Sequence, residues 1–300
     1  MAEVEKSTAS SIERAQYHQV GRNLLYAQTR AIDAIIDELH ALDRTKENAA
    51  IRVPLLMLQA VGVSVHSVLA LTHERSMGIR DCFGIARSAV ETAVNSAFIA
   101  VSGIAAAEKA IRHMRQKRWR DLHRLGRVGH LNISVSRNIG LEANDLSGLQ
   151  EALDEYTNKK GDEVRDWTPE NLQKRIAAVS DEHRKAGLCL GVAYFSIYRP
   201  ASELLHGTYY GVNFFWQGSR DAPALGKDDF DELWVTEHFV TLLTALFFGV
   251  SGAIEAISSI HKLPGHSKLQ DELALKLSAL VESMNGNGDD DGHDFRSEQA

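Results

Sequence analysis

The chain has 300 residues, of which 44% are hydrophobic and 24% charged, and its net charge is −7 at neutral pH. This composition excludes an intrinsically disordered chain, because enough apolar side chains are present to build a sizeable core. Two cysteines, Cys82 and Cys189, are too few for a disulfide scaffold, and their apolar surroundings predict buried, reduced thiols. The first residues lack the regions of a signal peptide, so we expect a cytoplasmic protein.

Hydrophobic residues recur at helical spacing through almost the whole chain, and only five prolines interrupt them. The pattern predicts an all-α fold, a single multi-helix bundle of long amphipathic and buried helices. We assign residues 1–284 to one helical bundle domain, because no boundary forces a division. The segment 285–300 is rich in glycine and aspartate and is expected to be a disordered acidic tail.

In chain order, the periodicity predicts helices separated by short polar or glycine-containing stretches, with a loop at 138–144. The expected helices cover residues 12–42, 51–72, 77–101, 105–127, 145–158, 169–185, 193–207, 228–261 and 267–283. Two apolar runs, 54–71 and 239–254, fall short of the about 20 apolar residues that a spanning helix needs. We interpret both as core helices, expect no membrane association, and interpret His66 as a buried core histidine.

A basic segment lies between Lys109 and His130, where eight lysine and arginine residues accompany a single acidic residue. Its net charge of +7 contrasts with the −7 of the whole chain and is typical of a surface for an anionic partner. The residues predicted to contact RNA are Arg112, Arg115, Lys117, Arg118 and Arg120, and Trp119 is available to stack on a base. Pairing of this helix with acidic parts of the same protein or of a second subunit explains the pattern equally well.

The third predicted helix carries a polar pair in an otherwise apolar sequence. Arg87 and Glu91 are four residues apart, so their side chains can form an ion pair along one helical face. A structural ion pair explains both residues without any function. Alternatively, the pair lines a cleft and contacts a ligand there.

The stretch 193–207 is the one place where ionisable side chains gather within an apolar helix. At about 100° per residue, four polar side chains fall on one face of this helix: Arg199, Ser202, Glu203 and His206. We take Ser202, Glu203 and the adjacent Tyr198 as candidate binding residues. Pro200 removes one backbone donor, which predicts a kink or a restart of the helix at that point.

Several reaction classes lack their sequence signature. The chain contains no phosphate-binding P-loop, no dinucleotide-binding glycine fingerprint, no Gly-x-Ser-x-Gly nucleophile elbow and no His-Glu-x-x-His zinc motif. Glu203 and His206 form one Glu-x-x-His pair, but a di-iron bundle needs a second pair, which is missing. We therefore expect neither a metal nor another cofactor.

The spacing Arg199-x6-His206 resembles the Arg-x4-6-His motif of HEPN domains, which are all-helical and often dimerise. The HEPN resemblance implies a homodimer that cuts RNA without metal. In that reading His206 would move the proton of the 2′-hydroxyl group, and Arg199 would stabilise charge on the phosphate. The chain departs from the pattern at Pro200, because active HEPN members usually have a polar residue after the arginine.

A second resemblance covers the same region. The segment from Tyr198 to Gly207, together with Arg87-Ser-Ala-Val-Glu91, is similar to an uncharacterised bacterial helical family of the DUF5677 type. Two functional hypotheses follow from the residues and the resemblances. One is a metal-independent endoribonuclease of toxin or defence type. The other is a non-catalytic ligand-binding or interaction module, in which a polar cleft holds a small anionic or polar ligand. In a third, purely structural reading, the polar faces only align core helices.

Overall fold

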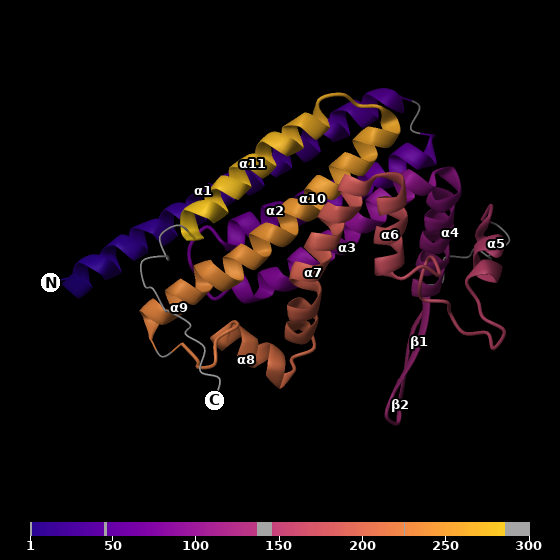
Figure 1. Ribbon diagram of the computed structural model, residues 1–300. Helices are drawn as coiled ribbons and strands as arrows, with labels where there is room; N and C mark the ends of the chain where they lie inside the picture. Colours follow the sequence, from indigo (N-terminus) through magenta and orange to yellow (C-terminus); the bar gives the residue numbers. More distant parts are fainter. Residues whose placement is uncertain (1, 45–46, 137–145, 225, 286–300) are drawn as a thin grey trace, which may run out of the picture.

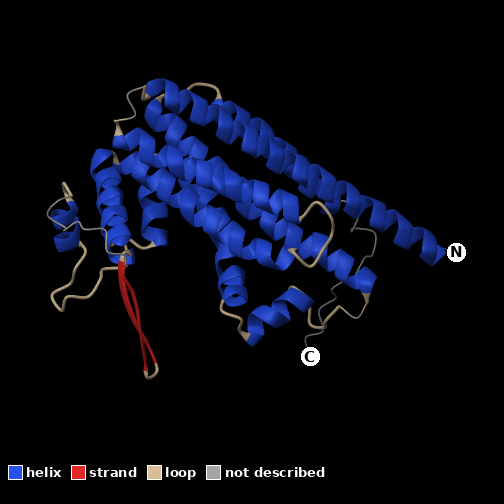
Figure 2. Cartoon of the chain, turned by 180° about the vertical axis from the view of Figure 1, so that it is seen from behind, coloured by secondary structure: helices blue, strands red, loops and turns tan. Residues whose placement is uncertain are grey.

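The computed structural model describes residues 2–44, 47–136, 146–224 and 226–285, and most of that length is helical (Figure 1). The described residues form a bundle of long helices with a small β-hairpin that projects from one end (Figure 2). This arrangement confirms the predicted all-α class. The expected loop at 138–144 and the expected acidic tail from residue 286 onward lie outside the described residues.

Helix α10, Val240–His261, passes through the middle of the bundle (Figure 1). Nearly all of its side chains from Leu242 to Ser258 are buried. A helix that is buried on every side has to be enclosed by other helices. Those that contact α10 are α1 (Ala2–Leu42), α2 (Ala49–Leu71), α3 (Ile79–Ser102), α7 (Arg184–Leu205) and α11 (His266–Asn285).

Shorter helices complete the bundle: α6 (Leu172–Glu182), α8 (Tyr209–Gln217), α9 (Lys227–Leu233) and a π-helical turn, η2 (Trp234–Phe239). The elements α9, η2 and α10 follow one another without a break, as the expected helix at 228–261 requires. Helix α7 is also continuous through Pro200, so the alternative of a helix restart at that residue is wrong.

Helix α4, Ile104–Asp121, ends before the expected boundary at Arg127, and this prediction was therefore wrong. The following residues form an antiparallel hairpin of β1 (His123–Val128) and β2 (Leu131–Ser136), after which α5 (Leu149–Glu155) begins beyond the residues that are not described. Gly129 has a φ of 59°, the left-handed conformation that a two-residue hairpin turn needs.

The strands also have a sequence signal, which the charge pattern obscured. Leu131, Ile133 and Val135 alternate with polar residues, the period of a strand rather than of a helix. Basic residues continue from α4 into β1, so the two segments were interpreted as one basic helix.

Two helical stretches are long and apolar enough to cross a membrane, judged by length and composition only: Ala49–Leu71 and Lys227–His261. In the second, 78% of the most apolar window is buried within the bundle, whereas in the first the share is 44%. Helix α2 buries one face and leaves Leu56, Val63 and His66 exposed on the other. The interpretation of His66 as a buried core histidine is therefore wrong.

Helices α6 and α7 approach each other so closely at Gly187 that no larger residue fits there. A Cβ atom on Gly187 would lie 2.4 Å from the Cα atom of Ser180, so the two backbones touch there. Gly252 of α10 is covered in a similar way, because its Cβ would lie 2.6 Å from Leu190 of α7. These contacts hold α7 close to both neighbouring helices.

Side chains from α1 cap the C-terminal end of α2. The guanidinium of Arg22 is buried and donates to the carbonyl oxygen of Leu69 at 2.5 Å and to Oγ1 of Thr72 at 3.2 Å. A cation is favourable in this position because the carbonyl end of a helix carries partial negative charge. The neighbouring His18 donates its Nε2 proton to the carbonyl oxygen of Thr72 at 2.8 Å and packs edge-on against Trp234.

The contact at Gly187 is testable with a matched pair of substitutions in α7. Gly187→Ala should lower the free energy of unfolding by about 1–3 kcal/mol, because the added methyl group overlaps the backbone of α6. Gly191→Ala is the control, because no atom lies within 4 Å of its added Cβ. The control should be neutral or stabilising by up to about 1 kcal/mol, since alanine favours a helix interior. Equal urea midpoints for the two variants would contradict the close packing.

The environment of His18 predicts a loss of stability in mild acid. Burial lowers the pKa of His18 from 6.5 to about 4, and the charge of Arg22 acts in the same direction. The stabilisation is complete above pH 6.5 and is lost as the pH falls towards 4, because the unfolded chain binds a proton that the folded chain refuses. The loss from this group is about 3 kcal/mol.

Urea unfolding at pH 4.5 and pH 7.5 measures this effect. His18→Gln should reduce the difference between the two pH values, because the substituted side chain does not titrate. The exposed His66 is the matched control, and His66→Gln should keep the difference found in the wild type. An unchanged pH dependence in His18→Gln would show that His18 is not the source.

Candidate functional site: the exposed face of α7 and α8

Arg87, Glu91 and Tyr198 form one connected cluster between α3 and α7. Nε of Arg87 donates to Oε1 of Glu91 at 2.8 Å, and its guanidinium lies 4.4 Å from the centroid of the Tyr198 ring. The Tyr198 ring lies 4.7 Å from the ring of Tyr194, whose hydroxyl accepts a hydrogen bond from Gln173 of α6 at 3.4 Å. The predicted ion pair is confirmed, and the cluster joins three helices.

Arg199 and His206 lie on another side of α7, and both are exposed. By helical geometry they are opposite the buried stripe that includes Ala193 and Ile197. The guanidinium of Arg199 lies 5.6 Å from the centroid of the Tyr210 ring. Within the described residues, the side chain of His206 forms no hydrogen bond or ion pair. Both groups are therefore accessible to a molecule outside the chain.

Ser202 and Glu203 are half-buried between Arg199 and His206. Oε2 of Glu203 accepts a hydrogen bond from Oγ1 of Thr208 at 2.7 Å. Oγ1 of Thr208 in turn accepts a hydrogen bond from the backbone N–H of Gly211 at 3.1 Å. Thr208 is the N-cap of α8. Glu203 is thereby engaged in holding the turn between α7 and α8.

Large apolar side chains surround Arg199 and His206 on the same surface. Phe195 is 86% exposed, and Tyr209 is 84% exposed. Leu188, on the same stripe of α7, is also exposed. We call the surface formed by Leu188, Phe195, Arg199, His206 and Tyr209 the α7–α8 face. Exposed apolar side chains gathered in this way are typical of a contact surface.

Three of the five basic residues that were predicted to contact RNA are engaged within the protein. The pairs are Arg112 with Glu155 at 2.6 Å, Lys117 with Glu163 at 2.5 Å, and Arg120 with the hydroxyl of Thr157 at 2.6 Å. The hydrogen bond from Lys117 lowers the pKa of Glu163. Arg115 and Arg118 are exposed, and neither forms a hydrogen bond or an ion pair within the described residues.

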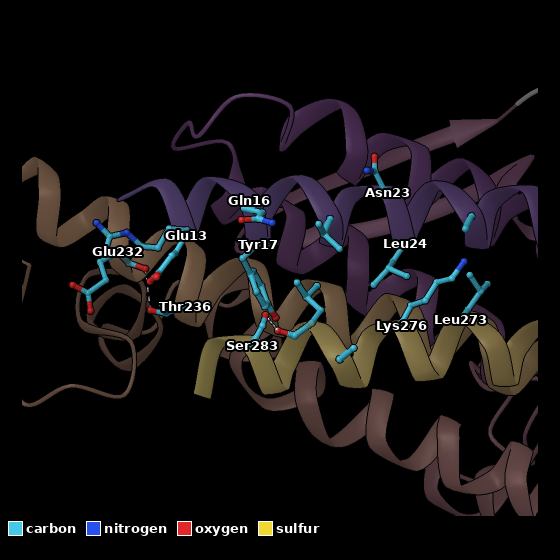
Figure 3. A pocket seen from close by; sticks show the side chains of 15 residues that line it. Glu13, Gln16, Tyr17, Asn23, Leu24, Glu232, Thr236, Leu273, Lys276 and Ser283 are labelled. Carbon is cyan, nitrogen blue, oxygen red and sulfur yellow. Dashed lines mark hydrogen bonds between the residues drawn. The ribbon is translucent and has the colours of Figure 1, made fainter. Parts of the chain in front are cut away.

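A cleft of about 900 Å3 lies between α1, α11 and the segment formed by α9 and η2 (Figure 3). Tyr17 points from α1 towards α11 near Ser283, and Glu232 and Thr236 lie at one end of the cleft. Burial raises the pKa of Tyr17 to about 12. Sequence reasoning missed this cleft because helices from opposite ends of the chain form its walls.

The described residues also bear on metal and thiol chemistry. They contain no group of three or more His, Cys, Asp or Glu side chains that is placed to hold a metal ion. Burial raises the pKa of Cys82 to about 12 and that of Cys189 to about 11. Neither thiol is therefore activated as a nucleophile, because a reactive cysteine needs a lowered pKa.

The fold and the site define a helical bundle with an arginine and a histidine on one exposed helical face. A family described as "Family of unknown function (DUF5677)" matches residues 52–223, more than half of the chain, and the chain belongs to this family. The matched region extends from α2 to beyond α8 and includes the Arg87 cluster and the α7–α8 face. No curated protein and no solved structure matches the chain.

The Arg87–Glu91 pair can be tested by replacing both residues with apolar ones. Arg87→Met combined with Glu91→Leu should leave the free energy of unfolding within about 1 kcal/mol of the wild type, because apolar groups replace an ion pair. Arg87→Ala alone should cost about 1–2 kcal/mol, since it removes the packing on Tyr198 and leaves Glu91 without its partner. In urea unfolding, a double variant that is less stable than the single variant would contradict a purely structural role.

Proposed function

We propose that the protein is a metal-independent endoribonuclease that acts through Arg199 and His206. The supporting observation is that both side chains are exposed on one face of α7, whereas Arg87, Glu91 and Glu203 are engaged by internal partners. An exposed imidazole can act as a proton acceptor, and an exposed guanidinium can stabilise a phosphate. The exposed face therefore carries the two groups that RNA cleavage without metal requires.

In this proposal two copies of the chain complete the site. His206 follows Arg199 by seven positions, which is about 10 Å along the helix axis. That separation is too long for both groups to act readily on one phosphodiester from a single chain. If two α7 helices pack antiparallel about a twofold axis near Ser202, Arg199 of one subunit lies level with the partner's His206. The exposed Phe195 and Tyr209 would supply the apolar area of such a contact.

The proposed reaction is attack by the 2′-hydroxyl group on the neighbouring phosphorus. The imidazole of His206 takes the 2′-hydroxyl proton, the 2′-oxygen forms a bond to phosphorus, and the bond to the 5′-oxygen breaks. The 5′-oxygen receives a proton from solvent, so the products carry a cyclic 2′,3′-phosphate and a 5′-hydroxyl group. The guanidinium of Arg199 stabilises the additional negative charge on the phosphate oxygens.

This proposal predicts that His206→Ala slows RNA cleavage at least about 100-fold, because the proton acceptor is lost. His66→Ala is the control, because it removes another exposed histidine, from α2, and should cleave like the wild type. The measurement is the formation of cyclic-phosphate ends from synthetic RNA in the presence of EDTA. Cleavage that survives His206→Ala, or that EDTA abolishes, would contradict the proposal.

The contribution of the second subunit is examined with the same assay. Phe195→Glu places a charge on the α7–α8 face without removing Arg199 or His206, and it should reduce both self-association and cleavage. Mixing Arg199→Ala protein with His206→Ala protein should restore part of the activity, because mixed dimers hold one intact pair. Failure of the mixture to recover activity, with self-association intact, would favour a site within a single chain.

A second candidate function is a non-catalytic ligand-binding module. The cleft in Figure 3 favours it, because the hydroxyl of the otherwise buried Tyr17 forms no hydrogen bond within the described residues. Its volume is within the range of about 300–1,000 Å3 that is common for small-molecule sites. Failure of the wild-type protein to cleave RNA in the assay above would favour this function.

A further inference from the structure

The basic residues of helix α4 differ in their contacts: some bind other parts of the protein and some are exposed. Arg112, Gln116 and Arg120 recur every four residues and lie on the face that bonds to α5 and to the segment after it. Arg115 and Arg118 lie about 100° and 160° around the helix from Gln116, and Trp119 lies between Arg112 and Arg115. The internal contacts therefore account for Arg112 and Arg120 and leave Arg115 and Arg118 unexplained.

On the side of Arg115 and Arg118 there is a hollow of about 670 Å3, at the end of the bundle where α4 and α5 lie together (Figure 1). Its walls are mainly apolar and come from α4 and its C-cap, from the turn before α5 and from the first residue of α5: Met114, Trp119, Leu122, Leu146 and Leu149. Arg115 and Arg118 also line it. A cavity of this size with apolar walls and a few polar groups has the properties of a small-molecule site.

The two arginines are placed for a ligand rather than for an internal partner. Both are exposed, and within the described residues neither forms an ion pair or a hydrogen bond. The one carboxylate on the hollow, that of Asp121, pairs with Arg124 at 3.5 Å. Gly148 lets the guanidinium of Arg115 approach the backbone, because a Cβ there would lie 2.8 Å from its Nη1 atom. The hollow is consequently apolar inside and positively charged at two points.

We propose that this hollow binds one nucleotide unit, with its base among Trp119 and the surrounding apolar side chains and its phosphate on Arg115 and Arg118. Arginine fits phosphate because its planar group can donate two parallel hydrogen bonds. A base supplies the flat apolar surface that stacks on a tryptophan ring. An acidic peptide would satisfy the arginines but has no flat group for the hollow. The proposal does not depend on cleavage by His206, because it concerns binding alone.

The experiment titrates the full-length chain with adenosine monophosphate and with ribose 5-phosphate, measured by calorimetry. Adenosine monophosphate should bind at least about tenfold more tightly, because only it has a base to stack. Arg115→Gln combined with Arg118→Gln should weaken its binding at least about tenfold through loss of the phosphate contacts. Trp119→Leu should weaken it similarly, whereas Trp119→Phe should restore most of the affinity.

The matched control is Arg30→Gln combined with Arg184→Gln, which removes the same charge from exposed arginines outside the hollow. It should bind adenosine monophosphate like the wild type. Equal weakening by both double variants, or equal binding of adenosine monophosphate and ribose 5-phosphate, would overturn the proposal. Tighter binding of an eight-residue glutamate peptide would overturn it in favour of an acidic protein partner.

A competition experiment separates a free nucleotide from a nucleotide within RNA. Single-stranded RNA of eight nucleotides is added to His206→Ala protein that holds a fluorescent adenosine monophosphate. Displacement of the fluorescent nucleotide in the low micromolar range assigns the hollow to RNA. Failure to displace assigns it to a free nucleotide. In either case the result is independent of whether the wild-type protein cleaves RNA.

Discussion

The burial of α10 is the constraint on which the rest of the structure depends. Nearly all of its side chains from Leu242 to Ser258 are buried, and most are apolar, so it is stable in water only when several other helices enclose it. Gly252 and the residues around Leu190 let α7 approach it closely. One charged group lies on α10 within this interior: Glu255, 1% exposed, which accepts a hydrogen bond from Lys185 at 2.5 Å. That pair fixes the start of α7 against α10, because a buried carboxylate needs a cation.

The position of α7 on α10 decides which of its side chains can meet other molecules. Small and branched residues of α7 pack against α10. The opposite side of α7, with Arg199 and His206, is therefore exposed. The ring of Tyr198 contacts the guanidinium of Arg87 of α3. The polar residues of one helix are thereby divided between an internal cluster and an exposed face, although they are neighbours in the sequence. The proposed cleavage site uses only the exposed group.

The same division occurs on α4. Contacts with Glu155, Glu163 and Thr157 engage three of its basic residues internally, whereas Arg115 and Arg118 remain at the hollow. The proposed nucleotide site and the proposed cleavage site lie on different elements of the family-matched region.

The sequence by itself determined the helical class and most helix positions, because apolar residues at a spacing of 3.6 have to lie on a buried face wherever the helix packs. It also predicted the Arg87–Glu91 pair, since four residues in a helix bring two side chains together. The end of α4 and the hairpin were missed because basic residues continue without a break where the spacing of apolar residues changes from that of a helix to that of a strand. Only the tertiary structure decided that His66 is exposed, that Glu203 holds Thr208, and that helices from both ends of the chain enclose the cleft beside Tyr17. Those outcomes depend on which neighbour covers each face, and contacts between distant segments leave no local pattern in the chain.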